Sequence, residues 1–180
     1  MLEQKRLKHD LVSGEPGALE RVYQAYLDDL LTLGVALCGD SALAEDAVQD
    51  VFVSLARRNG EFSLRGSLKA YLTTSVYNRI RDHFRASTRR RDRDAQLRTE
   101  EPQVMGIQER LVGTEEARRL NRALDTLPQE QRETVVLHLK ADKRLSEIAK
   151  LQGVSANTVR GRYRYALQKL RQVLDGQVTL

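Results

Sequence analysis

Residues 144–174 contain two amphipathic patterns separated by a Gly-Val pair, and this arrangement constrains the fold more than any other part of the chain. Before the break, apolar residues recur at helical spacing, and Gly153 then interrupts them. Ser155 follows as a candidate N-cap, because its side chain can accept a hydrogen bond from the first turn of a helix. The second pattern spans several turns and comprises Val159, Tyr163, Ala166, Leu167, Leu170, Val173 and Leu174. The segment therefore predicts a helix-turn-helix.

The opposite face of the second predicted helix is polar and cationic. At about 100° per residue, the positions that lie together on this face are Asn157, Arg160, Gly161, Arg164, Gln168 and Arg171. Residues 140–171 contain nine basic and two acidic residues. Such a row of arginines fits the major groove of DNA, although a solvated basic face has the same composition. The cap, the turn glycine and the arginine row together favour DNA binding.

The composition indicates a helical protein without strands. The chain has 180 residues, three Pro, no Trp and 5% aromatic residues, which leaves room for one ordinary domain or two small ones. Its single cysteine, Cys38, excludes an internal disulfide. No apolar stretch approaches the roughly 20 residues that span a bilayer, and the first residues lack the apolar core of a signal peptide. We therefore expect a cytoplasmic protein that does not insert into membranes.

Three amphipathic helices are predicted in the first half of the chain. After a polar lead-in, the first should begin after Ser13 and end near Cys38. The second has Ser41 as its predicted cap and should end near residues 59–60, and the third follows Ser67. Three apolar stripes of this kind can close a small core.

The two ends of the chain carry opposite charges. Residues 1–60 contain ten acidic and six basic residues, in contrast to the basic C-terminal region. Within this part, one outer face of the second predicted helix carries Glu45, Asp46, Gln49 and Asp50, with no cation in the same turns. We therefore expect this face to be an interface and the two ends to bind different partners.

Arginine and aromatic residues alternate along the third predicted helix. Residues 76–93 contain seven Arg, with Tyr77, His83 and Phe84 among them. Cationic side chains can follow the phosphates of a separated nucleic-acid strand while aromatic rings stack on its bases. The alternative is that Phe84 belongs to the core and the arginines only solvate a helix end. The pattern by itself leaves both interpretations open.

The predicted architecture is all-α, with two small helical domains joined by a flexible linker. Residues 1–90 form the N-terminal domain, and residues 91–113, which contain Pro102 and show no sustained periodicity, form the linker. Residues 114–180 form a four-helix domain that ends in the helix-turn-helix. One of its helices is expected to turn Val135, Val136 and Leu139 inward.

Neither a catalytic site nor a cofactor is predicted. Asp82 and His83 form a reversed His-Asp pair, but metal phosphohydrolases need further ligands, and the chain has only three His, spread over both halves. The sequence contains neither a GxxxxGK[ST] phosphate loop nor a GxSxG elbow.

Three stretches resemble bacterial RNA polymerase sigma factors of the extracytoplasmic-function (ECF) subfamily of the sigma-70 family. DSALAEDAVQDVFVSLARR, residues 40–58, is similar to the segment by which these factors bind the clamp coiled coil of the largest polymerase subunit. GSLKAYLTTSVYNRIRDHFR, residues 66–85, looks like the segment that opens and reads the minus-ten element. Within residues 123–174, LDTLPQEQRETVVL, SEIAKLQGVSANTVRGR and ALQKLR resemble the promoter-reading domain.

The resemblance implies a role for each set of residues. Binding to core RNA polymerase falls to Glu45, Asp46, Gln49 and Asp50. Melting of the minus-ten element falls to Tyr71, Asn78, Arg79, Asp82 and Arg85. Binding of the minus-thirty-five element falls to Ser155, Asn157, Thr158, Arg160, Arg162 and Arg164. The flap of the second-largest polymerase subunit and an anti-sigma factor are further implied partners. The chain departs from the common family pattern at Tyr71, where Trp is usual, and at Gly161 and Tyr165, where a small hydroxyl residue and an Arg are common.

The expected function is therefore promoter-specific initiation of transcription together with core RNA polymerase. One alternative is a helix-turn-helix regulator whose N-terminal half is a dimerisation or docking module. Another is an interaction protein that sequesters a polymerase or a regulator. Dependence on core polymerase separates these hypotheses, because a regulator should bind its DNA site alone.

Overall fold

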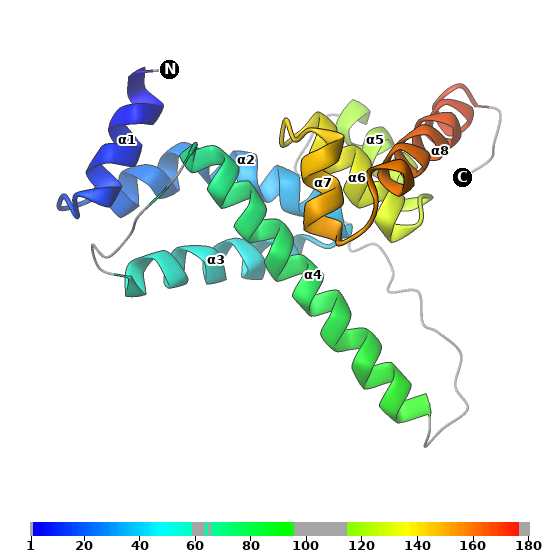
Figure 1. Ribbon diagram of the computed structural model, residues 1–180, viewed down its shortest axis with the longest axis horizontal. Helices are drawn as coiled ribbons and strands as arrows, with labels where there is room; N and C mark the ends of the chain where they lie inside the picture. The colour runs from blue at the N-terminus through cyan, green and yellow to red at the C-terminus, as the bar shows by residue number, and fades with distance from the viewer. Residues whose placement is uncertain (1, 59–63, 65, 96–114, 177–180) are drawn as a thin grey trace. The chain divides into compact units, whose positions relative to one another are not determined.

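The structure, a computed structural model, describes residues 2–58, 64, 66–95 and 115–176. These ranges contain eight helices and no strand (Figure 1), which confirms the predicted all-α fold. The chain divides into two compact units, one from residues 1–35 and 40–108 and the other from residues 36–39 and 109–180. The domain boundaries that we place at residues 90 and 114 stay a prediction.

The first unit begins with a helix where the sequence indicated only a polar lead-in. Helix α1 spans Leu2–Val12, and α2 spans Ala18–Cys38. Ser13, the predicted cap of the next helix, instead follows α1, and its backbone N–H donates to the carbonyl of His9 at 2.8 Å. The helices change direction through Gly14 and Gly17, which have φ values of 69° and 71° that favour glycine. Arg21 then pairs with Asp10 at 3.1 Å and holds α1 against α2.

Helix α3, Ser41–Arg57, is capped by a different residue from the predicted Ser41. Asp40 is the N-cap, and its Oδ1 accepts hydrogen bonds from the backbone N–H groups of Ala42 at 2.9 Å and Leu43 at 3.1 Å. A carboxylate there also interacts favourably with the positive end of the helix dipole. Because Asp and Ser are both good caps and lie side by side, sequence alone could not choose between them.

Helix α4, Leu68–Ala95, packs against α3 and closes the core of the first unit (Figure 1). Its buried side includes Leu72, Val76 and Ile80, each no more than 1% exposed. Helices α2 and α3 approach closely at Gly34, where an added Cβ would lie 2.8 Å from the Cβ of Ala44. Helix α4 continues to Ala95, so the first residues of the predicted linker are helical; the rest lie outside the described residues.

The second unit contains α5 (Glu115–Asp125), α6 (Gln129–Leu139), α7 (Leu145–Gln152) and α8 (Ala156–Leu174). Helix α8 contacts the other helices of the unit and buries Val159, Ala166, Leu170 and Val173 against them. Arg132 on α6 pairs with Asp125 on α5 at 2.6 Å.

The predicted turn of the helix-turn-helix is confirmed. Gly153 ends α7 in the left-handed conformation, with φ 70° and ψ 34°, and the Oγ of Ser155 accepts a hydrogen bond from the backbone N–H of Thr158 at 3.1 Å. The inward position predicted for Leu139 is wrong, because its side chain is 58% exposed. It is the last residue of α6, and burial along that helix ends at Leu137.

The cap of α3 offers a direct test of this local structure. We expect Asp40→Ala to lower the melting temperature by about 4–8 °C, because losing an N-cap costs about 1 kcal/mol in a domain of this size. Ser41→Ala is the matched control and should leave the melting temperature unchanged, and Asp40→Asn should restore most of the loss. Differential scanning calorimetry measures all three, and a larger effect at Ser41 than at Asp40 would contradict the assignment.

Candidate nucleic-acid interface

The outward face of α8 is polar and accessible, as the arginine row predicts. Asn157, Arg160 and Arg164 are exposed, as are Ser155 and Thr158 at the start of the helix. The Oδ1 of Asn157 accepts a hydrogen bond from Arg160 Nη1 at 2.8 Å, which orients that guanidinium along the helix surface. Buried apolar residues occupy the opposite side of α8, so these polar groups face away from the unit.

Arg162 differs from the other predicted readers because it points back into the unit. Its side chain is half-buried, and Nη1 donates to Gln152 Oε1 at 2.6 Å. Gln152, which is 7% exposed, in turn donates to Thr134 Oγ1 at 3.2 Å. The guanidinium thereby connects α8 through α7 to α6, which indicates that Arg162 sets the orientation of α8. Its predicted contact with DNA stays a prediction.

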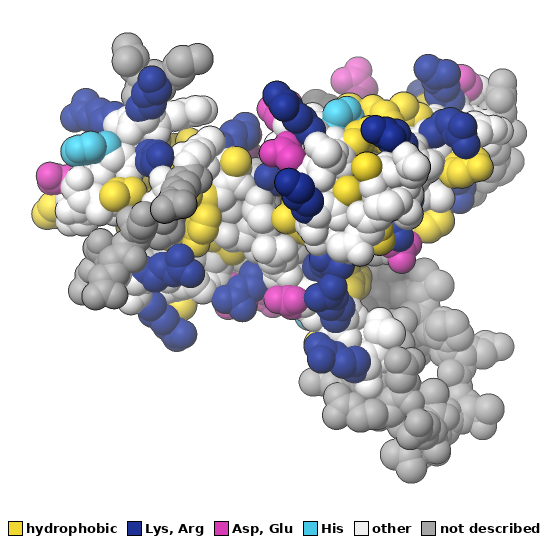
Figure 2. Space-filling view, viewed as in Figure 1, with side chains coloured by type: hydrophobic (Ala, Val, Ile, Leu, Met, Phe, Trp, Pro, Cys, Tyr) yellow, Lys and Arg dark blue, Asp and Glu magenta, His cyan; other side chains and the backbone are white. Residues whose placement is uncertain are grey.

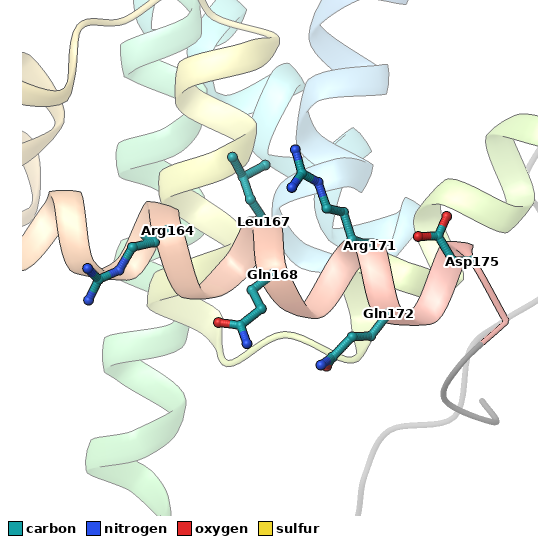
Figure 3. A pocket seen from close by; sticks show the side chains of 6 residues that line it. All are labelled: Arg164, Leu167, Gln168, Arg171, Gln172 and Asp175. Atoms are coloured by element: carbon teal, nitrogen blue, oxygen red, sulfur yellow. The ribbon is translucent and has the colours of Figure 1, made fainter.

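The polar face of α8 continues along the second half of the helix. Figure 3 shows Gln168 and Gln172 on the same side of α8, with Leu167 and Arg171 on the other side. A hollow of about 420 Å³ lies along this region, and the residues that line it come from α8 and its C-cap, Asp175. An active site gathers polar groups from several elements in a concave pocket, and this open hollow on one helix does not.

A polar stripe runs along α4 on the side opposite the core. At about 100° per residue, Tyr71, Asn78, Asp82 and Arg85 lie within about 60° of one another. Asn78, Asp82 and Arg85 are exposed, whereas Tyr71 is half-buried. The next position on this stripe is Arg89, also exposed, which the sequence analysis did not single out. Its spacing of four residues from Arg85 is the signal that could have identified it.

Arg79 lies apart from the other residues predicted on α4. It is exposed, and its Nη2 donates to Ser54 Oγ on α3 at 3.0 Å. This hydrogen bond turns the guanidinium toward the junction of the two helices, about 100° around α4 from Asn78. The structure therefore places four of the five predicted α4 residues on one stripe and Arg79 beside it.

The acidic face of α3 is fully exposed. Within the described part of the chain, the side chains of Glu45, Asp46, Gln49 and Asp50 form no hydrogen bond or ion pair with another residue. Val53, which sequence analysis missed, lies on the same face and is 47% exposed. Val53 is an apolar residue at a position outside the buried stripe of α3, and this mismatch is the signal that could have identified it. Protein interfaces combine an apolar contact with a polar rim, and this face has residues of both kinds.

Positive charge is concentrated on the candidate DNA-binding helices. On the face shown in Figure 2, Lys and Arg side chains recur along the course of α4 and over the second unit.

Within the described ranges, no group of three or more His, Cys, Asp and Glu side chains is placed to hold a metal ion. None of the helices in these ranges combines the length and apolar character that crossing a bilayer requires.

Comparison with known families matches both units. Residues 22–90 match the family described as Sigma-70 region 2, and residues 123–172 match Sigma-70, region 4. The first match contains α3 and most of α4, and the second contains the helix-turn-helix. The three surfaces, on α3, α4 and α8, therefore lie in segments with a family assignment.

Individual relatives extend over nearly the whole chain. The ECF RNA polymerase sigma factor SigK of Mycobacterium ulcerans is 23% identical over 94% of this chain and 92% of its own length. The ECF sigma factor SigM of Mycobacterium tuberculosis is 28% identical over 91% of this chain and 80% of its own length.

Solved structures share the fold. The sigma factor RpoE of Bartonella quintana, solved with the anti-sigma factor NepR, has a TM-score of 0.63 and 23% identity, covering 88% of this chain and 98% of its own. CnrH, solved with the cytosolic domain of CnrY, has a TM-score of 0.63 and 24% identity, covering 97% of this chain and 99% of its own.

The helix-turn-helix, its cationic outward face and the separate acidic helix define a DNA-binding protein with an additional docking surface. The two family matches and the relatives specify which kind. The chain belongs to the sigma-70 family and is a promoter-directing sigma factor of the ECF class.

The contact of Arg162 with Gln152 predicts that Arg162 anchors α8, and two variants test this role. We expect Arg162→Ala to lower the melting temperature by several degrees, because a polar group left unpaired at a buried site costs about 1–3 kcal/mol. Arg171→Ala removes the same charge from an exposed position of α8 and should change stability by less than about 0.5 kcal/mol. Equal melting temperatures for the two variants would show that Arg162 does not anchor the helix.

Proposed function

We propose that this sigma factor uses a separate surface for each step of initiation. The acidic face of α3 binds core RNA polymerase, the stripe on α4 holds the unpaired minus-ten strand, and the outward face of α8 binds the minus-thirty-five duplex. The observation that carries the proposal is the face of α3, where exposed carboxylates and Val53 lie together without partners among the described residues. DNA is a polyanion and is repelled by carboxylates, so this surface favours a protein partner.

The chemistry of α3 suits docking on a charged protein surface such as the clamp coiled coil. Asp46 and Asp50 lie one turn apart and present ionised carboxylates that can pair with cationic side chains of a partner. Charged groups of this kind steer association and select the partner, while a desolvated apolar residue contributes to the stability of the complex. Val53 supplies the apolar contact at this site.

Charge reversal on α3 tests this surface. We expect Asp46→Lys with Asp50→Lys to reduce binding of core polymerase by at least 100-fold, because like charges replace attractive pairs across the interface and such changes cost several kcal/mol. Asp28→Lys, an exposed carboxylate on α2, is the matched control. Binding is measured by fluorescence anisotropy with labelled sigma factor, and circular dichroism verifies that helicity is unchanged. Undiminished binding by the double variant would falsify the assignment.

The stripe on α4 has the groups that a single strand requires. The Asn78 amide can both donate to and accept from a base edge, and Arg85 and Arg89 can follow the phosphates. Tyr71, half-buried at the start of the same stripe, can stack on a base with its exposed part. Extrusion of a base from the duplex costs a few kcal/mol, so the protein must compensate by stacking and hydrogen bonds.

Loss of the Asn78 amide should affect strand opening and little else. We expect Asn78→Ala to retain polymerase binding and upstream DNA affinity but to reduce open-complex formation on duplex promoters by at least tenfold. A pre-melted template should restore most of the transcript, because the unpairing cost is then already met. Permanganate reactivity of promoter thymines and run-off yield measure the two effects. Thr88→Ala, an exposed position of α4 outside the stripe, is the control, and normal opening by Asn78→Ala would move melting to another element.

The outward face of α8 supplies upstream recognition. Arg160 and Arg164 lie one turn apart and can reach guanine edges or phosphates, and Ser155 and Thr158 lie at the helix N-terminus, where backbone N–H groups favour a phosphate. The same unit exposes Leu120 and Leu139 by 39% and 58%. These apolar side chains suit a protein partner, and we assign them to contact with the polymerase flap.

Two further features of the proposal follow from the family. The RpoE relative was solved with an anti-sigma factor, and we extend such a partner to this chain. The site of action is the cytoplasm, where bacterial RNA polymerase transcribes, and the role of the protein there is binding and DNA opening rather than catalysis. Transcription of a fragmented genomic template by core enzyme with this protein tests the function as a whole and identifies its promoters. Absence of any promoter-specific transcript would overturn it.

A further inference from the structure

We propose that Gly161 and Tyr165 on α8 determine promoter specificity by together forming a contact with a thymine methyl group in the upstream element. Gly161 leaves space for the edge of a base pair, and the ring of Tyr165 provides the apolar surface beside it. The proposal rests on the proposed function of α8. It goes further in giving a role to Gly161 and Tyr165, which are not among the residues implied to bind the minus-thirty-five element, and in naming the base they contact.

No contact among the described residues requires a glycine at position 161. It lies inside α8, where glycine is less favourable than alanine because it loses more conformational freedom on folding. A Cβ added there would meet no described heavy atom of the chain within 4 Å, and the residue has no positive φ. Gly34 shows the contrast, because a Cβ there would lie 2.8 Å from Ala44. The space at Gly161 is therefore open toward the outside.

The position of Gly161 places this space on the DNA-binding face. It follows Asn157 by one turn and precedes Tyr165 by one turn, and both of these residues are exposed. Gly161 is half-buried, but no described atom fills the place of its missing Cβ, so a partner can approach the helix backbone more closely here than at a neighbouring position that carries a side chain. Close approach of a backbone to a ligand is one of the established uses of glycine.

Tyr165 forms the wall of this space. Its side chain is 55% exposed. The guanidinium carbon of Arg164 lies 5.1 Å from the centroid of the Tyr165 ring, and Arg164 Nη2 donates to the Tyr165 hydroxyl at 3.5 Å. The cation orients the ring and occupies part of its surface. The side of the Tyr165 ring toward position 161 meets no side chain there, because glycine has none.

A thymine is the base that this arrangement fits. In the major groove, only thymine presents a methyl group, and protein surfaces read it by apolar contact. An aromatic ring beside a helix position without a side chain provides such a contact. The bidentate reading of a guanine edge uses two donors, and these two residues supply only one side-chain donor, the Tyr165 hydroxyl. The inferred ligand is therefore a thymine of an A·T pair in the minus-thirty-five region.

Gly161→Ala provides a test in which the stability of the protein and its affinity for the promoter are expected to change in opposite directions. The alanine should raise the melting temperature, or leave it unchanged, because it favours the helix. Binding of holoenzyme to its strongest promoter, identified by transcription of a fragmented genomic template, should nevertheless weaken by at least tenfold, because the methyl fills the space for the base pair. A purely structural role for Gly161 cannot produce this combination. Unchanged promoter affinity would overturn the proposal.

The thymine contact is tested by changing the protein and the DNA together. Each thymine of the upstream element is replaced in turn by uracil, which lacks only the methyl group, and affinity is measured by electrophoretic mobility shift with wild-type and Tyr165→Ala holoenzymes. We expect one position at which wild type loses roughly tenfold and the variant loses nothing further. If no thymine shows this coupling, the ring does not contact a methyl group and the proposal fails.

Arg160→Ala and Arg164→Ala distinguish failure of this proposal from failure of the proposed function. Loss of affinity in these variants with none in Gly161→Ala and Tyr165→Ala would overturn the specificity contact and leave α8 as the DNA-binding helix. Normal affinity in all of them would place upstream recognition on another surface and overturn both.

Discussion

The burial of one apolar side of α8 determines how the second unit can meet DNA. Val159, Ala166 and Leu170 pack against the other helices of the unit, and each is at most 7% exposed. Because a helix has a fixed rotation per residue, burial of this side turns the opposite side outward. Asn157 and Arg164 face the solvent for this reason, and their position does not depend on any single polar contact. The same packing leaves Tyr165 exposed at the surface.

In the first unit, burial of one side of α3 and one side of α4 likewise exposes two surfaces of opposite charge. Helix α3 buries Val48, Val51 and Leu55 and presents Asp46 and Asp50 on its other side. Helix α4 buries its apolar positions against α3 and presents a stripe rich in amide and guanidinium groups. One core thus supports an acidic and a basic surface on neighbouring helices. An acidic surface attracts cationic partners and a surface rich in guanidinium groups attracts anionic ones, so the two surfaces suit different partners.

Polar contacts refine these surfaces without creating them. Arg160 is oriented by Asn157, Arg162 by Gln152, and Arg79 by Ser54. A guanidinium has donors in a fixed planar arrangement, so one hydrogen bond restricts where the remaining donors can point. Arginines that look equivalent along the sequence therefore differ in role: Arg160 is held along the outward face, whereas Arg162 is held toward the interior of the unit.

Much of the fold and of the candidate site is determined locally and could be predicted from the sequence. The helical spacing of Val159 to Val173, the turn at Gly153 and the cap at Ser155 depend on residues within a few positions of one another. The exposure of Glu45 and Asn78 follows from the same periodicity. What depends on residues distant in the chain, or on a choice between equivalent neighbours, could not be predicted. The cap at Asp40 instead of Ser41 and the exposure of Leu139 belong to this second group.

The sequence by itself therefore determined that the chain is helical, which face of each helix is apolar, and which segments carry acidic or basic charge, because periodicity and charge are properties of neighbouring residues. The packing of the helices was needed to establish that Arg162 points to Gln152, that Arg79 reaches Ser54, and that no described residue fills the space beside Gly161. These features require knowledge of which atoms of other helices come within a few ångströms, and that distance is set by packing rather than by position along the chain.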